Sequence, residues 1–205
     1  MKFTPIKLNL PSVADDAGSD RNPGLHVSGI IKHLLMQLDP KKYSKGEDTD
    51  TRLLWELGLA WEDIALSRAF WTRILKRTYP KASFKQVQCS LDDIWGTCDM
   101  ITLGKRTLIT ESKLTRYSMV HHPETSMNFW SWRVQMMAYC KMWGGTDALL
   151  PVCFLNGDYR PKIITARAWD ITFEQDEIED NWSMMLQARD EIIKLTKKEK
   201  RKNRG

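Results

Sequence analysis

After the first 24 residues, apolar positions recur with a helical period and predict two helices before any strand. The first helix is expected to begin with Ser28 as N-cap and to end before Pro40, with a polar loop over residues 41–50. The second helix is expected over residues 52–77. The predicted buried residues are Ile30, Ile31, Leu34, Leu35 and Leu38 in the first helix, and Leu54, Leu57, Trp61, Ile64, Ala65, Ala69 and Leu75 in the second.

The pattern then changes to short apolar runs separated by turn residues, which is typical of strands. Strands are predicted over residues 84–91 and 94–103, joined at Asp92-Asp93, and over residues 107–115. A helix over 127–143, two strands over 148–155 and 162–170, and a last helix over 174–194 follow. This order implies an α/β fold in which helices flank a central mixed β-sheet.

Composition adds limits on the class of protein. The 205 residues carry a net charge of +5 and four cysteines without C-x-x-C spacing, which favours reduced thiols in a soluble, cytoplasmic protein. We expect no membrane association, because no apolar run is long enough to span a bilayer. Residues 1–24 are expected to form a partly disordered arm, 25–195 the folded domain, and 196–205 a basic tail. The tail is either a solvated end or a contact for nucleic-acid phosphates.

Candidate chemistry lies in the hairpin of residues 96–113, which carries Asp99 on one strand and Glu111 and Lys113 on the next. Glu111 and Lys113 share a face because side chains alternate along a strand. A three-residue loop over 104–106 would place Asp99 opposite Glu111, whereas a two-residue loop would put the two carboxylates on opposite faces. The chemistry therefore depends on the longer loop or on a bulge.

Two carboxylates beside a lysine suit metal-assisted hydrolysis of phosphodiesters. The carboxylates would hold Mg²⁺, with Mn²⁺ as a substitute, and the lysine would position water or stabilise the pentavalent phosphate. The alternative is that these are ordinary polar residues on the solvent face of a hairpin. Glu62 is a further candidate, because it lies on the apolar side of its helix one turn after Gly58. A surface charge at the edge of that side is the competing interpretation.

Histidines give weaker signals. His26 is expected to pack or to cap the first helix, and a substrate contact is the less favoured alternative. His121 and His122 have no cysteine or acidic partner at zinc-ligand spacing, so we expect a polar loop there.

Four motifs in order resemble the PD-(D/E)XK nuclease superfamily, and within it the RecB-like and phage-type exonuclease branch. They are Gly58-x-x-x-Glu62, Gly96-x-x-Asp99, Glu111-Ser112-Lys113 and Gln135-x-x-x-Tyr139. The resemblance implies a restriction-endonuclease-like core. It implies that Asp99, Glu111 and Lys113 are catalytic, and that Glu62, Asp99, Glu111 and the Ser112 carbonyl are metal ligands. Gln135 and Tyr139 would then contact the nucleic-acid strand. Some relatives hold an iron–sulfur cluster through N- and C-terminal cysteines, but the cysteines here lie between Cys89 and Cys153, so no cluster is predicted.

The predicted function is a Mg²⁺-dependent deoxyribonuclease, more in keeping with an exonuclease or end-processing enzyme than with a sequence-specific endonuclease. The resemblance suggests phage or mobile-element recombination or replication, in a bacterial or phage-infected cell, with DNA and proteins of those processes as partners. The alternatives are a catalytically silent nucleic-acid-binding or scaffold protein and an RNA-cleaving nuclease. Cleavage polarity, strand preference and oligomeric state are not encoded in these motifs.

Overall fold

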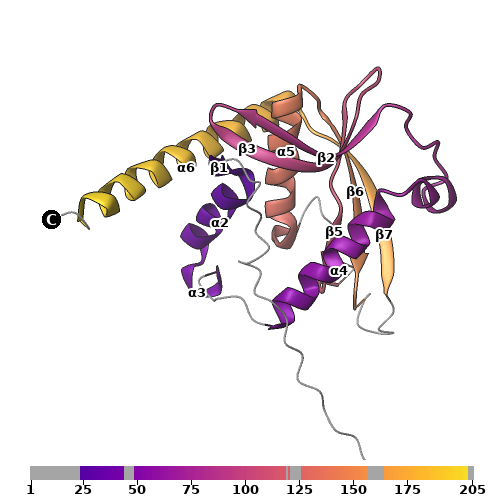
Figure 1. Cartoon of the computed structure of the whole chain (residues 1–205), viewed down its shortest axis with the longest axis horizontal. Coiled ribbons are helices and arrows are strands. Elements are labelled where there is room, and N and C mark those ends of the chain that lie inside the picture. The colour runs from indigo at the N-terminus through magenta and orange to yellow at the C-terminus, as the bar shows by residue number, and fades with distance from the viewer. Residues whose placement is uncertain (1–23, 44–48, 119, 121–125, 157–163, 203–205) are drawn as a thin grey trace, which may run out of the picture.

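The structure is a computed structural model that describes residues 24–43, 49–118, 120, 126–156 and 164–202. Most of the predicted N-terminal arm, together with His121 and His122, lies outside the described residues. A seven-stranded mixed sheet forms the centre of the described chain, with helices on both of its faces (Figure 1). The predicted fold class is therefore confirmed.

Antiparallel pairs form the first half of the sheet. β2 (Ser83–Leu91) and β3 (Ile94–Thr102) are joined by Asp92 and Asp93, whose φ angles of 50° and 60° give the left-handed turn that suits a two-residue hairpin. β3 continues antiparallel to β4 (Leu108–Thr110) and parallel to the short β1 (Leu25–His26).

The strand expected over residues 107–115 is interrupted. β4 and β5 (Lys113–Thr115) are separated at Glu111 and Ser112, yet both pair with β6 (Asp147–Phe154) in parallel and in the same register. The Glu111 amide still donates to the Leu149 carbonyl of β6 at 3.0 Å. The interruption therefore affects the side facing β3, while the β6 side remains a continuous ladder. β7 (Thr165–Thr172), which begins three residues later than predicted, pairs antiparallel with the other edge of β6.

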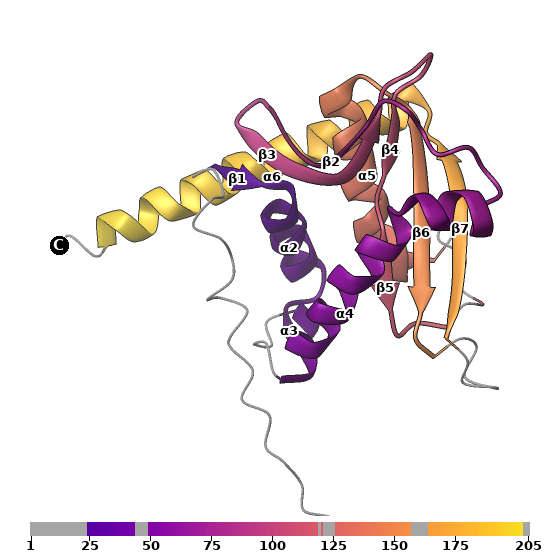
Figure 2. The ribbon, with the colours of Figure 1, turned by 45° about the vertical axis from the view of Figure 1, so that its right-hand side comes forward.

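Three helices cover one face of the sheet and enclose the larger hydrophobic core (Figure 2). They are α2 (Val27–Leu38), α5 (Trp130–Trp143) and α6 (Gln175–Lys202). α5 follows a 3₁₀ turn (Met127–Phe129) and ends at Gly144 in the left-handed conformation, as its sequence predicts. α6 is longer than expected, because the helix continues through the basic segment to Lys202 with exposed side chains.

The opposite face carries α4 (Thr49–Ala65) and a smaller core that includes Trp61, Met100 and Leu149. The single helix predicted over residues 52–77 is wrong. α4 ends at Ala65, Ser67 accepts a hydrogen bond from the Phe70 amide, and a separate π-helix, η1 (Phe70–Ile74), follows. Ile64 is 54% exposed, because this helix carries more apolar residues than its buried face can hold.

Two expectations near the N-terminus are also corrected. α2 begins at Val27, so the N-cap is His26 rather than Ser28, and the His26 side chain makes no capping hydrogen bond. Leu38 at the other end is 64% exposed. The polar stretch after Pro40 is not wholly a loop, because α3 (Pro40–Tyr43) and the start of α4 take up its two ends. Among the described residues, no helix is long and apolar enough to span a membrane.

Candidate active site

The register of the β3–β4 hairpin brings the two motif carboxylates together. Thr102 pairs with Leu108 and Met100 with Thr110, and the next position along the two strands places Asp99 opposite Glu111. This is the register expected from the three-residue loop. The interruption at Ser112 then allows the chain to contact Asp99 directly: Asp99 Oδ2 accepts hydrogen bonds from the Ser112 amide at 2.7 Å and from its hydroxyl at 2.8 Å.

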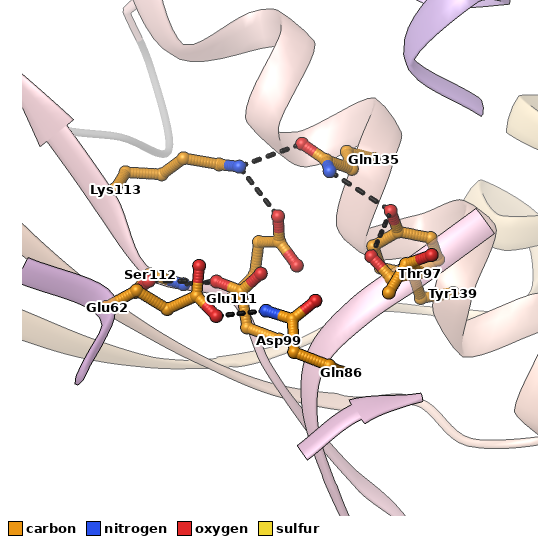
Figure 3. Close-up of polar contacts among 9 residues, drawn as sticks. All are labelled: Glu62, Gln86, Thr97, Asp99, Glu111, Ser112, Lys113, Gln135 and Tyr139. Atoms are coloured by element: carbon orange, nitrogen blue, oxygen red, sulfur yellow. Dashed lines mark hydrogen bonds and ion pairs between the residues drawn. The ribbon is translucent and has the colours of Figure 1, made fainter. Parts of the chain in front are cut away.

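Lys113 connects this carboxylate pair to α5 (Figure 3). Its Nζ donates to Glu111 Oε1 at 2.6 Å and to Gln135 Oε1 at 2.9 Å. Gln135 in turn donates to the Tyr139 hydroxyl at 3.1 Å, since residues four apart share one face of a helix. The structure therefore brings Asp99, Glu111, Lys113, Gln135 and Tyr139 into one connected group.

Tyr139 also binds the middle of β3, where one edge of the strand has no neighbouring strand in the described part of the chain. β2 pairs along one edge of β3, while β1 and β4 pair with only the two ends of its other edge. The Tyr139 hydroxyl donates to the Thr97 carbonyl at 2.9 Å within that gap. Gly96 makes this approach possible, because a Cβ atom at this position would lie 2.5 Å from Tyr139 Cε1. The two motif residues are therefore coupled: any side chain at position 96 would clash with the Tyr139 ring.

Glu111 is the most deeply buried of the motif carboxylates, at 2% exposure. Its Oε1 is held by Lys113, but its Oε2 has no hydrogen-bond partner among the described protein atoms. Burial raises the pKa of Glu111 to about 7, with the Asp99 charge adding to the rise and Lys113 opposing it. Burial alone would lower the pKa of Lys113, but the charges of Glu111 and Asp99 outweigh it and keep the ammonium protonated.

Glu62 reaches the same region from α4, on the opposite face of the sheet from α5. It is half-buried, and its Oε1 accepts a hydrogen bond from Gln86 Nε2 of β2. Burial, followed by the nearby Asp99 charge, raises the pKa of Glu62 to about 7. Glu62 therefore lies at the edge of the buried side of α4, near Asp99, and its assignment as a metal ligand stays a prediction. No described element approaches Gly58 closely, because a Cβ atom there would meet nothing within 4 Å.

Gln86 is a site residue that the sequence did not reveal. It lies between the pairs Lys85–Met100 and Val87–Cys98, and so faces Asp99 across the hairpin. Its φ of 50° is rare for a residue other than glycine. Because a glutamine on a half-exposed strand resembles any other polar strand residue, no signal in the pattern could have identified it.

A metal ion has suitable donors here, although they are not preassembled. The described residues contain no group of three or more His, Cys, Asp or Glu side chains placed to hold one ion together. Glu62 is bound to Gln86, and one oxygen of Asp99 is bound to Ser112. The partnerless Glu111 Oε2 and the raised pKa values of two glutamates nevertheless fit a hard cation, which favours carboxylate oxygens.

Comparison with known proteins gives matches to solved structures only. No protein-family model matches the chain, and no curated protein matches its sequence. A phage-related exonuclease from Haemophilus somnus 129PT matches with a TM-score of 0.48 and 17% identity, over 83% of this chain and 83% of that one. The alkaline exonuclease LHK-Exo from Laribacter hongkongensis matches with a TM-score of 0.49 and 13% identity, over 87% of this chain and 94% of that one.

The same enzyme in complex with dAMP matches with a TM-score of 0.47, 13% identity and the same coverage. The solved structures that this chain resembles include proteins described as exonucleases. Similarity at this level of identity concerns the fold alone.

Proposed function

We propose that this chain is a metal-dependent nuclease that hydrolyses DNA phosphodiester bonds as an exonuclease or end-processing enzyme. The observation that carries the proposal is the buried Glu111 carboxylate. Glu111 lies beside Asp99; one of its oxygens is held by Lys113, and the other has no hydrogen-bond partner among the described residues. A buried carboxylate with a free oxygen is costly unless a ligand completes it. A carboxylate pair beside an ammonium group matches the needs of phosphodiester hydrolysis.

The ligands of the proposed metal are Asp99, Glu111, Glu62 and the Ser112 carbonyl. A bound Mg²⁺, or Mn²⁺ in its place, would lower the pKa of an attacking water and neutralise charge on the phosphate. Engagement of Glu62 would require its carboxylate to leave Gln86, because that contact now occupies one of its oxygens. The neutral fraction of Glu62 and Glu111 near pH 7 would lose its protons as the ion binds.

Lys113 and α5 supply the remaining roles. The Lys113 ammonium lies between Glu111 and Gln135, where it can donate to a water or to a phosphate oxygen. Gln135 is fixed by Tyr139, and Tyr139 is fixed by the Thr97 carbonyl. This chain of hydrogen bonds restricts the rotamers of Lys113, which favours one orientation toward the reacting phosphate.

The biological setting that we propose is phage or mobile-element recombination or replication, with DNA as the partner. RNA cleavage, or a catalytically silent binding or scaffold role, would be the alternative outcome of the test below. The intact Asp99, Glu111 and Lys113 support the enzyme, because a silent protein gains nothing from burying an incompletely paired carboxylate.

The test is incubation of the protein with end-labelled linear, circular and single-stranded DNA and with RNA, in Mg²⁺, Mn²⁺ or EDTA. We expect metal-dependent loss of linear DNA and survival of the circle. Lys113→Ala should reduce the rate by about a hundredfold or more. Lys105→Ala, which removes an exposed lysine from the hairpin tip, is the matched control and should retain full activity. Full activity of Lys113→Ala would contradict the assignment of the site.

A further inference from the structure

A cavity with cationic walls lies beyond the C-terminal end of α4, outside the candidate active site. After α4 the chain forms the π-helix η1, reverses direction and continues into β2. The residues of this turn line a cavity of about 740 Å³ that is open to solvent. Figure 2 shows this segment beside β7. No aspartate or glutamate lines the cavity, whereas four cationic residues do: Arg68, Lys76, Arg77 and Lys81.

Three of these charges have no anionic partner. Arg77 forms a two-point ion pair with Asp170 of β7, which fixes its guanidinium and offsets its charge. Arg68, Lys76 and Lys81 are exposed and form no ion pair within the described part of the chain. Cations gathered around one concavity repel one another and together create a positive potential that attracts anions.

The conformation of Lys76 adds an independent observation. The Leu75 amide donates to the Phe70 carbonyl at 3.0 Å and the Arg77 amide to the Trp71 carbonyl at 2.9 Å, so the π-helix ends in a tight reversal. Lys76 lies at this reversal with a φ of 56°, in the left-handed conformation that glycine or asparagine adopts with less strain. A strained lysine with an exposed side chain contributes no packing that would explain its presence. Such outliers and π-turns occur often at functional positions.

The same two elements carry the cavity and part of the candidate active site. α4 holds Glu62 and leads to Arg68, while β2 begins with Ser83 at the cavity wall and continues to Gln86 beside Glu62. Gln86 is three steps along the strand from Ser83, a distance of about 10 Å. Successive phosphates of one DNA strand advance about 3.4 Å along the axis. A strand bound beside Glu62 and Gln86 can therefore present a phosphate to the cavity only a few nucleotides away.

We propose that the cavity lined by Arg68, Lys76 and Lys81 binds backbone phosphates of the polynucleotide that enters the candidate active site. This inference rests on the proposed nuclease function for the identity of the ligand. The Thr78 hydroxyl adds a donor that can bind a phosphate oxygen, whereas the hydroxyls of Thr72 and Ser83 donate to the Arg68 and Pro80 carbonyls. The contact is to phosphates, so it anchors the strand without selecting a base sequence.

The test measures binding without cleavage. The Kd for a short fluorescein-labelled duplex is determined by anisotropy in EDTA over a series of KCl concentrations. Arg68→Gln combined with Lys81→Gln should reduce the slope of log affinity against log salt by about two, since each phosphate contact contributes about one. The matched control is Lys32→Gln combined with Lys41→Gln, which removes two exposed lysines from α2 and α3. This control should keep the wild-type slope.

Lys76→Gly separates binding from folding. It removes a charge and relieves the left-handed strain, so we expect weaker duplex binding together with a Tm equal to or above that of the wild type. Wild-type slope and Kd in both the double variant and Lys76→Gly would overturn the inference, even if the protein cleaves DNA. If no nucleic acid is cleaved but the cavity variants still lose affinity and slope, the proposed enzyme fails while the phosphate site stands.

Discussion

Replacement of Glu62 by glutamine gives a sharp test of the electrostatics of the site. Burial and the Asp99 charge raise the pKa of Glu62 from 4.5 to about 7 in the folded protein. A carboxyl whose folded pKa exceeds its unfolded pKa contributes stability below the unfolded value, and that contribution is lost as pH rises through the folded value. The ionised Glu62 therefore lowers the free energy of unfolding above about pH 7, whereas a glutamine at this position does not.

The magnitude follows from the pKa difference. The shift from 4.5 to about 7 corresponds to a ceiling of roughly 3 kcal/mol, at 1.36 kcal/mol for each pKa unit. Because Glu62 is half-exposed, solvent screening reduces this figure, and we expect about 1–2 kcal/mol. Glu111, whose pKa is also raised to about 7, titrates in both proteins and largely cancels in their comparison.

The assay is urea unfolding in EDTA at about pH 5 and about pH 8, pH values that bracket most of the expected titration. Glu62→Gln should be more stable than the wild type at the higher pH and nearly equal at the lower pH. Glu199→Gln changes the net charge equally at an exposed position of α6 and is the matched control. The reasoning is refuted if Glu62→Gln differs from the wild type by the same amount at both pH values. Added Mn²⁺ should then stabilise the wild type more than Glu62→Gln.

Two further predictions concern packing and the basic end of α6. Gly96→Ala places a Cβ 2.5 Å from Tyr139 Cε1, so unfolding experiments should show a loss of about 1–3 kcal/mol. Gly29→Ala, where a Cβ meets nothing within 4 Å, is its control and should be neutral or stabilising. Deletion of the residues after Thr196 removes, within the described part of the chain, only exposed helical residues up to Lys202, so Tm should stay nearly constant. If this basic segment contacts phosphates, the salt slope of duplex binding should fall; an unchanged slope would leave it a solvated end.

Sequence reasoning succeeded where one local rule determined the geometry. The four-residue spacing placed Gln135 beside Tyr139, because residues four apart share one face of a helix. The hairpin was only half determined: the sequence allowed a two-residue or a three-residue loop, and the structure has the register of the longer loop, which places Asp99 opposite Glu111.

The errors occurred where tertiary contacts outweighed local pattern. The apolar period runs on through the break between α4 and η1, so nothing in it indicates that Ser67 interrupts the helix. The sequence pattern does not indicate the gap between β4 and β5 either. The gap arises because the Ser112 amide binds the Asp99 side chain instead of a neighbouring strand. The contact between Gln86 and Glu62 joins two elements with no shared spacing. These features became apparent only when the elements were placed together.

The open edge of β3 between β1 and β4 bears on how the protein avoids association with its own copies. Unpaired strand edges are templates for pairing with other chains, and aggregation commonly begins there. Here Tyr139 of α5 covers the gap, because its hydroxyl donates to the Thr97 carbonyl and its ring lies against Gly96. The tyrosine assigned to substrate contact would thus also keep a neighbouring strand out of the sheet. A Tyr139→Ala variant made to weaken substrate binding would uncover this edge, and its solubility would fall together with its activity.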